Sequence, residues 1–298
     1  MKVDATKRRN AISKHIFCYS LLLVPIIHFI IFWLLVNVNT LLLPFQQEKT
    51  GSFTWDNFKY IFTLLGAGGE LQVALLNTLR YYIQHMLTAF VIAPLFAYFL
   101  YKNILGSKLF NILFMLPMIV SGIVMISIYK TMVGADGPIS VLYEKITGNS
   151  MPFLLYDDSS ATATIIAYCI WTGFGMNLIL FSGAMVRIPT EIIESVQLDG
   201  IGFFKEFFTI ELPLIWPTLS ITLLVSVNTI FMSTGPILYF TQGMYKTYTI
   251  HYWFYANVIV LGNYNKAAAL GILLSAAGAP AAIIVAVIRH KFKTDVKY

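Results

Sequence analysis

Side chains able to carry out chemistry are few in this sequence. The nucleotide-binding and hydrolase signatures GxxxxGK[ST], HExxH and GxSxG are absent. Ser182, followed by Gly183, could act as a nucleophile inside an apolar run. However, no glycine stands two residues before it and no histidine follows within a later apolar run. The residues therefore argue against an enzyme.

Two histidines, His28 and His85, are the ionisable side chains in the interior of the apolar runs. Either could relay protons in a secondary transporter, because ionisable groups in a membrane are costly and are kept for function. The alternative is a histidine packed against a neighbouring helix or a lipid headgroup. Since no carboxylate accompanies them there, we expect the energy source to lie on another protein.

The most informative polar residues lie between two apolar runs, in residues 187–213. Thr190 after a proline suits a helix N-cap, Glu191 suits the positive end of the helix dipole, and Gly200 can adopt the left-handed conformation that ends a helix. A helix of about nine residues is predicted between them. It is too short to cross a bilayer.

An apolar strip runs along this short helix through Ile192, Ile193 and Val196, and phenylalanines follow it. The strip must be buried against the membrane, against the protein's own helices or against another protein. An interfacial connector is therefore as compatible with the pattern as a docking element.

The elements that position these residues are predicted from composition. Hydrophobic residues make up 58% of the 298 residues and charged residues 11%, far below the share of about 25% in a typical globular protein. The sequence therefore predicts an all-α polytopic membrane protein, a single transmembrane domain over 1–298. Its six apolar runs are 16–38, 79–101, 109–130, 162–186, 212–236 and 267–288.

The distribution of basic residues predicts the orientation. With an even number of spans both termini lie on one side, and the segments on that side carry 13 of the 20 Lys and Arg. Acidic residues divide equally, so the net charge of +6 lies there. By the positive-inside rule both termini, and the loop 187–213, are predicted to be cytoplasmic. No basic run is interleaved with aromatics as nucleic-acid binding would require.

Small residues have two expected roles. Gly173, Gly175 and Gly183 are expected to let helices approach closely. Cys18 and Cys169 lie far apart in apolar runs without a neighbouring metal-ligand cluster, so we interpret them as small buried hydrophobes. No metal site is expected.

The loop also carries a recognisable pattern. Glu194-Ser195-Val196, three residues, Gly200, nine residues and then Ile210-x-Leu212-Pro213 resembles the EAA loop of binding-protein-dependent ABC importer permeases, the MetI-like or type I family. Asp199 and Phe207 also match. Ser195 and Val196 depart from the two alanines of the pattern, and Ile201 from the alanine common after the glycine.

Further segments resemble the carbohydrate branch of this family, which carries maltose and oligosaccharides. They occur in the family's order: Trp55-x-Asn57-Phe58, Ala74-Leu75-x-Asn77-Thr78, Thr241-Gln242-Gly243 and Tyr264-x-x-Ala267-Ala268-Ala269-Leu270. The resemblance implies the permease subunit of an ATP-driven importer in a bacterial plasma membrane. An importer for peptides, amino acids or polyamines is the alternative within the superfamily, and a secondary transporter the alternative outside it.

The resemblance also implies roles and partners. The loop helix would be a coupling helix in a cleft of a separate ATPase subunit, with ATP and Mg on that dimer and no cofactor in this chain. A second, different permease and an extracytoplasmic binding protein would complete the assembly. The coupling residues would be Glu191, Glu194, Ser195, Val196, Asp199, Gly200, Phe207, Ile210 and Pro213.

Candidate sugar contacts follow from residue type and depth in the later spans. Aromatic rings cover the apolar faces of sugars, and amides and hydroxyls bond to their hydroxyl groups. On this basis we select Trp171, Asn177, Asn228 and Ser233. Packing between helices is the alternative role for each.

Overall fold

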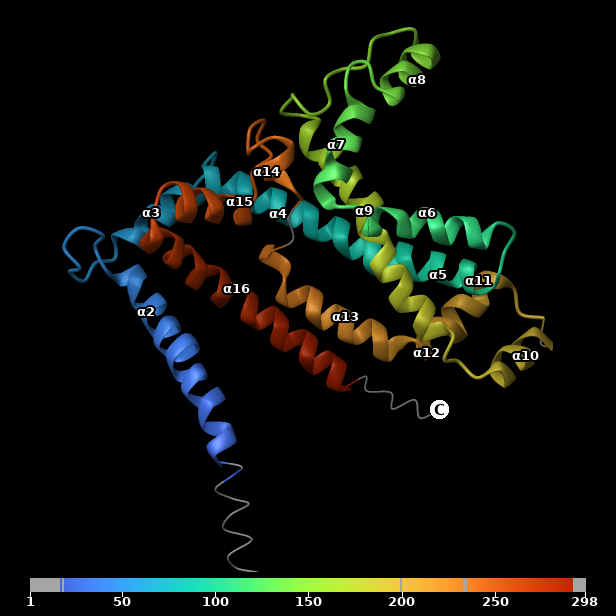
Figure 1. Cartoon of the computed structure of the whole chain (residues 1–298), viewed down its shortest axis with the longest axis horizontal. Helices are drawn as coiled ribbons and strands as arrows, with labels where there is room; N and C mark the ends of the chain where they lie inside the picture. The colour runs from blue at the N-terminus through green and yellow to red at the C-terminus, as the bar shows by residue number, and fades with distance from the viewer. Residues whose placement is uncertain (1–16, 18, 199, 233–234, 292–298) are drawn as a thin grey trace, which may run out of the picture. The chain divides into compact units, whose positions relative to one another are not determined.

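The computed structural model describes residue 17 and residues 19–198, 200–232 and 235–291 (Figure 1). Within these ranges every regular element is helical, and the β-type contact is an isolated bridge between Gln46 and Phe53. The predicted all-α class is therefore confirmed. Cys18, Asp199 and Ser233 lie outside the described residues.

Among the described residues, four helices are long and apolar enough to cross a membrane: Tyr19–Phe45, Glu70–Tyr101, Ala161–Met185 and Tyr264–Ile288. Two bent helix pairs raise the number to six if each pair is one span. The six predicted spans correspond to these six elements in order. The second helix begins at Glu70, nine residues before the apolar run does, because the charged and polar residues of its first turns do not break a helix.

Each bent pair breaks where the backbone leaves the helical region. The first pair, Ser107–Ile119 and Gly122–Thr147, meets at 110°, and Val120 between them is extended, with ψ 144°. The second pair, Phe203–Leu214 and Trp216–Asn228, meets at 72°. There Pro217 occupies the first turn of the new helix, where its missing N–H costs nothing.

The elements take their labels from Figure 1. In chain order they are η1 (Phe29–Leu35), α2 (Val36–Leu42), η2 (Leu43–Phe45), α3 (Asp56–Leu65), α4 (Glu70–Leu87), η3 (Thr88–Ile92), α5 (Ala93–Tyr101), α6 (Ser107–Ile119), α7 (Gly122–Val133), α8 (Pro138–Thr147), α9 (Ala161–Met185), α10 (Thr190–Leu198), α11 (Phe203–Glu206), η4 (Phe207–Glu211), α12 (Leu212–Leu214), α13 (Trp216–Asn228), η5 (Ile230–Met232), α14 (Ile237–Phe240), α15 (Ile250–Tyr255), η6 (Ala256–Val260) and α16 (Tyr264–Lys291).

The chain divides into two compact units, Met1–Phe62 with Gly262–Leu273, and Thr63–Leu261 with Leu274–Tyr298. The single domain expected over 1–298 stays a prediction. In the first unit, two asparagines from distant segments donate to one backbone carbonyl. Asn57 Nδ2 lies 3.0 Å and Asn265 Nδ2 2.6 Å from the oxygen of Gln46. Two of the motifs noted in the sequence therefore meet there.

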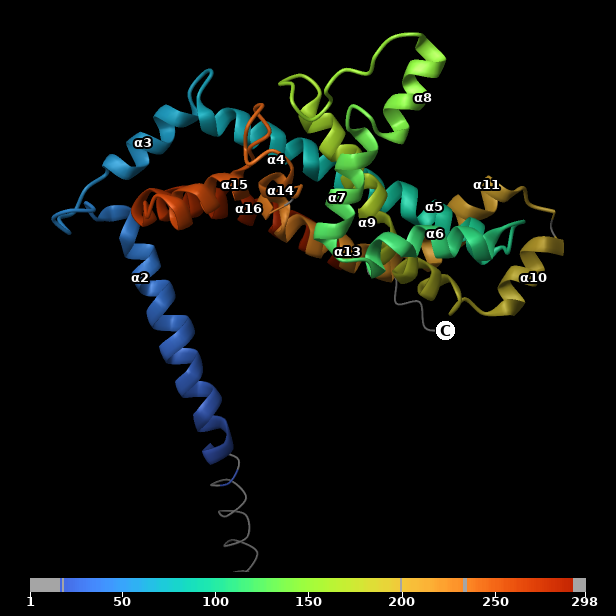
Figure 2. The same ribbon diagram turned by 45° about the horizontal axis from the view of Figure 1, so that its top comes forward.

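In the second unit, α9 packs along α5 and α6, and the three helices lie side by side in both views (Figures 1 and 2). Gly175 permits this packing, because a Cβ there would stand 2.7 Å from the carbonyl oxygen of Phe114 on α6. Gly173 and Gly183 have no such neighbour within 4 Å. Close approach therefore explains one of the three glycines.

Two apolar cores stabilise the second unit. One joins α5, α9, α10, η4 and α13, and includes the buried Tyr98, Phe181, Ile193, Phe207 and Leu219. The other joins α4, α7, α9 and α14, and includes Tyr81, Tyr129, Ile165 and Phe240. The first core contains Ile193 of the loop helix, and the second lies beside the cavity described below.

Candidate functional site

The short helix predicted in the loop 187–213 is present as α10, over Thr190–Leu198. Thr190, predicted as the N-cap, is its first helical residue. Its apolar strip is buried at Ile193 (8% exposed) and Val196 (6%), and Ile193 joins the core shared with α5 and α9. Glu191 and Glu194 are exposed on the same helix. The helix is therefore fixed by one face and offers an acidic face to its surroundings.

Ser195 does not extend this acidic face with a free hydroxyl. Its Oγ donates to the backbone oxygen of Glu191 at 3.0 Å, one turn earlier. Leu198 at the end of α10 is 88% exposed. The exposed side of the helix thus combines carboxylates with one large apolar side chain.

Gly200 has φ +63°, the left-handed conformation predicted for it. A Cβ at this position would meet no atom within 4 Å, so glycine is favoured by the backbone angle and not by crowding. Asp199 lies outside the described residues.

The rest of the predicted loop has three different environments. Phe207 is 3% exposed, and its ring lies 5.3 Å from the ring of Tyr98 on α5. Ile210 is half-buried and Pro213 is exposed. Phe207 thus connects the segment after α10 to the long α4–α5 helix, whereas Pro213 lies near the end of the bent pair's first arm.

A charged cluster beside Phe207 was missed by sequence reasoning. Lys102, just after α5, donates to the carboxylate of Glu206 at 2.5 Å, and both side chains are largely buried. Glu211 is fully buried. A residue separation of 104 leaves no local sequence signal for this ion pair.

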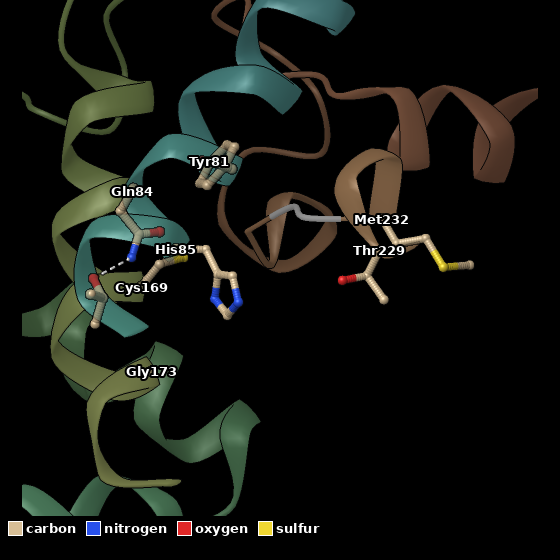
Figure 3. A pocket seen from close by; sticks show the side chains of 8 residues that line it. Tyr81, Gln84, His85, Cys169, Gly173, Thr229 and Met232 are labelled. Atoms are coloured by element: carbon tan, nitrogen blue, oxygen red, sulfur yellow. Dashed lines mark hydrogen bonds between the residues drawn. The ribbon is translucent and has the colours of Figure 1, made fainter. Parts of the chain in front are cut away.

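A cavity of about 270 Å³ lies at the middle of the second unit (Figure 3). It is lined by Tyr81, Gln84, His85, Thr88, Cys169, Gly173, Thr229 and Met232, which come from α4, η3, α9, the end of α13 and η5. Figure 3 shows these elements around the cavity, with Gln84 bonded to Thr88 at 3.0 Å. Polar donors and acceptors therefore line it from two sides.

The hydroxyl of Tyr81 is the notable group in this lining. The residue is 2% exposed, and among the described residues its oxygen has no hydrogen-bond partner. A buried polar group without a partner costs free energy.

The residues predicted to contact sugar do not line this cavity. Trp171 and Asn177 lie on α9 and flank the lining residue Gly173, and the Asn177 amide donates to the Gly173 carbonyl at 3.3 Å. Asn228 precedes the lining residue Thr229, and its amide donates to Leu224. Ser233 lies outside the described residues. The cavity is bordered by α9 and by the end of α13, which carry predicted residues, and by α4, which carries none of them. The sugar contacts themselves stay a prediction.

The predicted outer side has its own hydrogen-bond network. Asn77 of α4 donates to the carbonyls of Lys246 (2.6 Å) and Tyr248 (3.0 Å), and Thr78 accepts from the amide of Ile250. Asp158, whose carboxylate hydrogen-bonds to Lys246, holds the pKa of that lysine above its usual range. The Asn-Thr motif noted in the sequence therefore fixes the segment before α15 to α4.

The chain is similar in sequence to known transport proteins. No protein-family profile matches the chain. It is 28% identical to the probable ABC transporter permease protein YesP of Bacillus subtilis, over 80% of this chain and 78% of that protein. It is 26% identical to the multiple sugar-binding transport system permease protein MsmF of Streptococcus mutans, over 72% and 77%.

The fold has a counterpart among solved structures. A chain of a bacterial ABC transporter involved in the import of the acidic polysaccharide alginate superposes with a TM-score of 0.78 and 23% identity, covering 97% of this chain and 99% of that one. This likeness shows the fold. By sequence the chain is therefore similar to ABC transporter permease proteins, one of them from a multiple sugar-binding transport system, and by fold it is similar to a chain of an ABC importer.

Proposed function

We propose that this chain is a permease subunit of an ATP-driven importer and forms half of the path for a sugar or oligosaccharide. The similarity to sugar-system permeases over most of the chain is the observation that carries the proposal. The geometry supports it, because a short helix with a buried apolar face and an exposed acidic face ends at a left-handed glycine in the predicted cytoplasmic loop.

The chain would occupy a bacterial plasma membrane as a multi-pass protein. A second permease, an ATPase dimer at the cytoplasmic face and an extracytoplasmic binding protein would complete the transporter. One solved relative in fold is a bacterial alginate ABC transporter in complex with an alginate pentasaccharide-bound periplasmic protein. ATP and Mg would bind the ATPase subunits, and this chain would carry no catalytic site of its own.

Within the chain, we propose that the cavity between α4, α9 and α13 is part of the sugar path. Gln84, Thr88 and Thr229 offer amide and hydroxyl groups, and the unpartnered Tyr81 hydroxyl can bond to a sugar hydroxyl. Its volume of about 270 Å³ suits part of a ligand rather than a whole oligosaccharide.

Reconstitution tests the proposed function. The chain, purified with its partner permease, ATPase and binding protein, is placed in proteoliposomes containing ATP, and uptake of labelled oligosaccharides, peptides and polyamines is compared. We expect ATP-dependent uptake of an oligosaccharide. Uptake that persists without the ATPase would instead identify a secondary transporter. Uptake of a peptide or a polyamine, without uptake of an oligosaccharide, would show that the substrate is not a sugar.

The cavity assignment is tested by Gln84→Ala and Thr229→Ala. Loss of one hydrogen bond to a ligand costs about 0.5–1.5 kcal/mol, so each substitution should raise the concentration for half-maximal uptake by about two- to tenfold. Thr147→Ala, on the exposed end of α8, serves as the control and should leave uptake unchanged. Equal uptake by all three variants would remove the cavity from the sugar path.

A further inference from the structure

A buried charged cluster lies where α5 meets the segment that follows the coupling helix α10. Lys102 Nζ bonds to Glu206 Oε1 at 2.5 Å, and the two side chains are 16% and 7% exposed. The same Nζ lies 5.5 Å from the centre of the Tyr98 ring, one turn earlier on the helix. The ion pair thus binds the end of α5 to the end of α11, and the cation–π contact holds the lysine against Tyr98 on its own helix.

Aromatic contacts reinforce this connection. The Tyr98 ring lies 4.5 Å from the ring of Phe203, and its hydroxyl donates to the Phe203 carbonyl at 3.4 Å. The Phe207 ring packs against the same Tyr98 ring, with 5.3 Å between the ring centres. Because Tyr98 is fully buried, a shift of α11 cannot leave the last turn of α5 undisturbed.

Glu211 adds a second carboxylate to the cluster. It is 0% exposed, and among the described residues neither of its oxygens has a hydrogen-bond partner. It lies close enough to Lys102 and Glu206 to interact electrostatically with both. The π-helix η4 aligns the two glutamates, since hydrogen bonding from residue i to i+5 places Glu206 and Glu211 on one side.

The cluster therefore contains two buried carboxylates and one lysine. Replacing such charges by apolar residues of similar size is often neutral or stabilising, so stability alone does not explain them. Leaving a buried carboxylate without a partner is costly. Lys102 can therefore pair with either of two carboxylates, Glu206 or Glu211. In the structure it pairs with Glu206.

We propose that Lys102 alternates between Glu206 and Glu211, and that this exchange positions α5 relative to the segment after α10 during transport. In the described conformation the lysine holds Glu206. In the alternate conformation, a shift of α11 and η4 along α5 brings Glu211 to the lysine. The helix predicted to contact the ATPase and the helix that lines the sugar cavity are thereby connected, because α5 continues α4 through η3.

The inference rests on the proposed function, and its test uses the complete reconstituted transporter. Glu211→Gln removes the ionisable carboxylate of the second acceptor, and it leaves the observed ion pair between Lys102 and Glu206 in place. We expect it to lower the number of sugar molecules taken up per ATP hydrolysed by about tenfold, within the range typical of coupling between sites. The melting temperature of the purified complex should stay the same or rise, because a buried unpartnered charge is lost.

Glu206→Gln removes the negative charge of the observed ion pair and leaves the buried lysine without its counter-ion, so it has the opposite effect on stability. The melting temperature should fall, and uptake per ATP should again fall by about tenfold. Glu144→Gln on α8 is the matched control, since it makes the same chemical change at an exposed site, and it should leave both quantities unchanged.

The outcomes separate a positioning role from a structural one. Unchanged uptake per ATP in Glu211→Gln overturns the proposal. So does a fall in melting temperature, or failure of that variant to assemble, because Glu211 would then be a structural residue. If the wild-type complex takes up no sugar, the proposed function fails first and this inference with it. If the wild type takes up sugar and Glu211→Gln does so equally well, the inference alone fails.

Discussion

At the scale of single residues, Gly200 shows how a backbone angle can be a requirement of the site. It has φ +63° and open space where a side chain would project. Left-handed backbone costs a residue other than glycine about 1–2 kcal/mol, less for asparagine, which adopts it more readily. The angle determines the direction in which the chain leaves α10.

Two substitutions at this position therefore form a matched pair. Gly200→Val should redirect the chain after α10 and reduce ATP-dependent uptake strongly, by about tenfold or more, since about 1.4 kcal/mol corresponds to a factor of ten. Gly200→Asn should retain most of the uptake. The measurement is uptake and ATP hydrolysis by the reconstituted transporter, and equal activity of both variants would show that the left-handed turn is not needed for coupling.

At the scale of elements, α10 has two faces with separate tasks. Ile193 belongs to the core shared with α5 and α9, whereas Glu194 and Leu198 are exposed. We expect the buried face to stabilise the chain, because it packs in this core. We expect the exposed face to contact a partner protein. The two contributions can be measured independently.

Ile193→Ala should lower the stability of the purified chain in detergent by about 2–4 kcal/mol, because a buried isoleucine leaves a cavity. Glu194→Ala and Leu198→Ala should leave the melting temperature unchanged and weaken copurification of the ATPase subunit. Copurification at the wild-type level in both surface variants would contradict a docking role for this face. A stable Ile193→Ala variant would contradict its role as the anchor.

The bent pairs show what hydropathy misses at this scale. Residues 109–130 and 212–236 read as single apolar runs, yet each corresponds to helices meeting at a large angle, 110° and 72°. Val120 and Ile215, where the backbone ψ angle changes, are themselves apolar. Hydropathy therefore does not indicate the two bends. Prolines 117 and 217 lie close to the two bends, but proline alone does not specify an angle.

At the scale of the whole molecule, the charge distribution predicts which side faces the cytoplasm. Thirteen of the 20 Lys and Arg fall in the segments assigned inside, which include the loop with α10. The coupling assignment depends on this orientation, because the ATPase can reach only cytoplasmic loops.

Cysteine labelling in intact cells tests the orientation. Ser150→Cys, after α8, should react with a membrane-impermeant maleimide added outside, and Lys205→Cys, between α10 and η4, should react only after the membrane is opened. Both positions are exposed, so accessibility within the protein does not separate them. The reverse pattern would place α10 outside and exclude the coupling role.

The sequence alone determined the helical class, the six apolar runs, the short helix at 190–198 and its terminal glycine. These features are local, because hydropathy, capping and the steric freedom of glycine act over a few residues. The motif resemblance also came from the sequence, since its spacing survives substitution at Ser195 and Val196. The roles of the coupling residues themselves stay predictions.

Tertiary structure alone decided which distant residues share a site. It brought Lys102 to Glu206, Asn77 to the carbonyls before α15, and Gln84 of α4 to the cavity beside Gly173. It also placed Trp171 and Asn177 beside that cavity instead of in its lining. Which side of an apolar helix faces a cavity depends on the packing of its neighbours, and no periodicity marks that side when every face is hydrophobic.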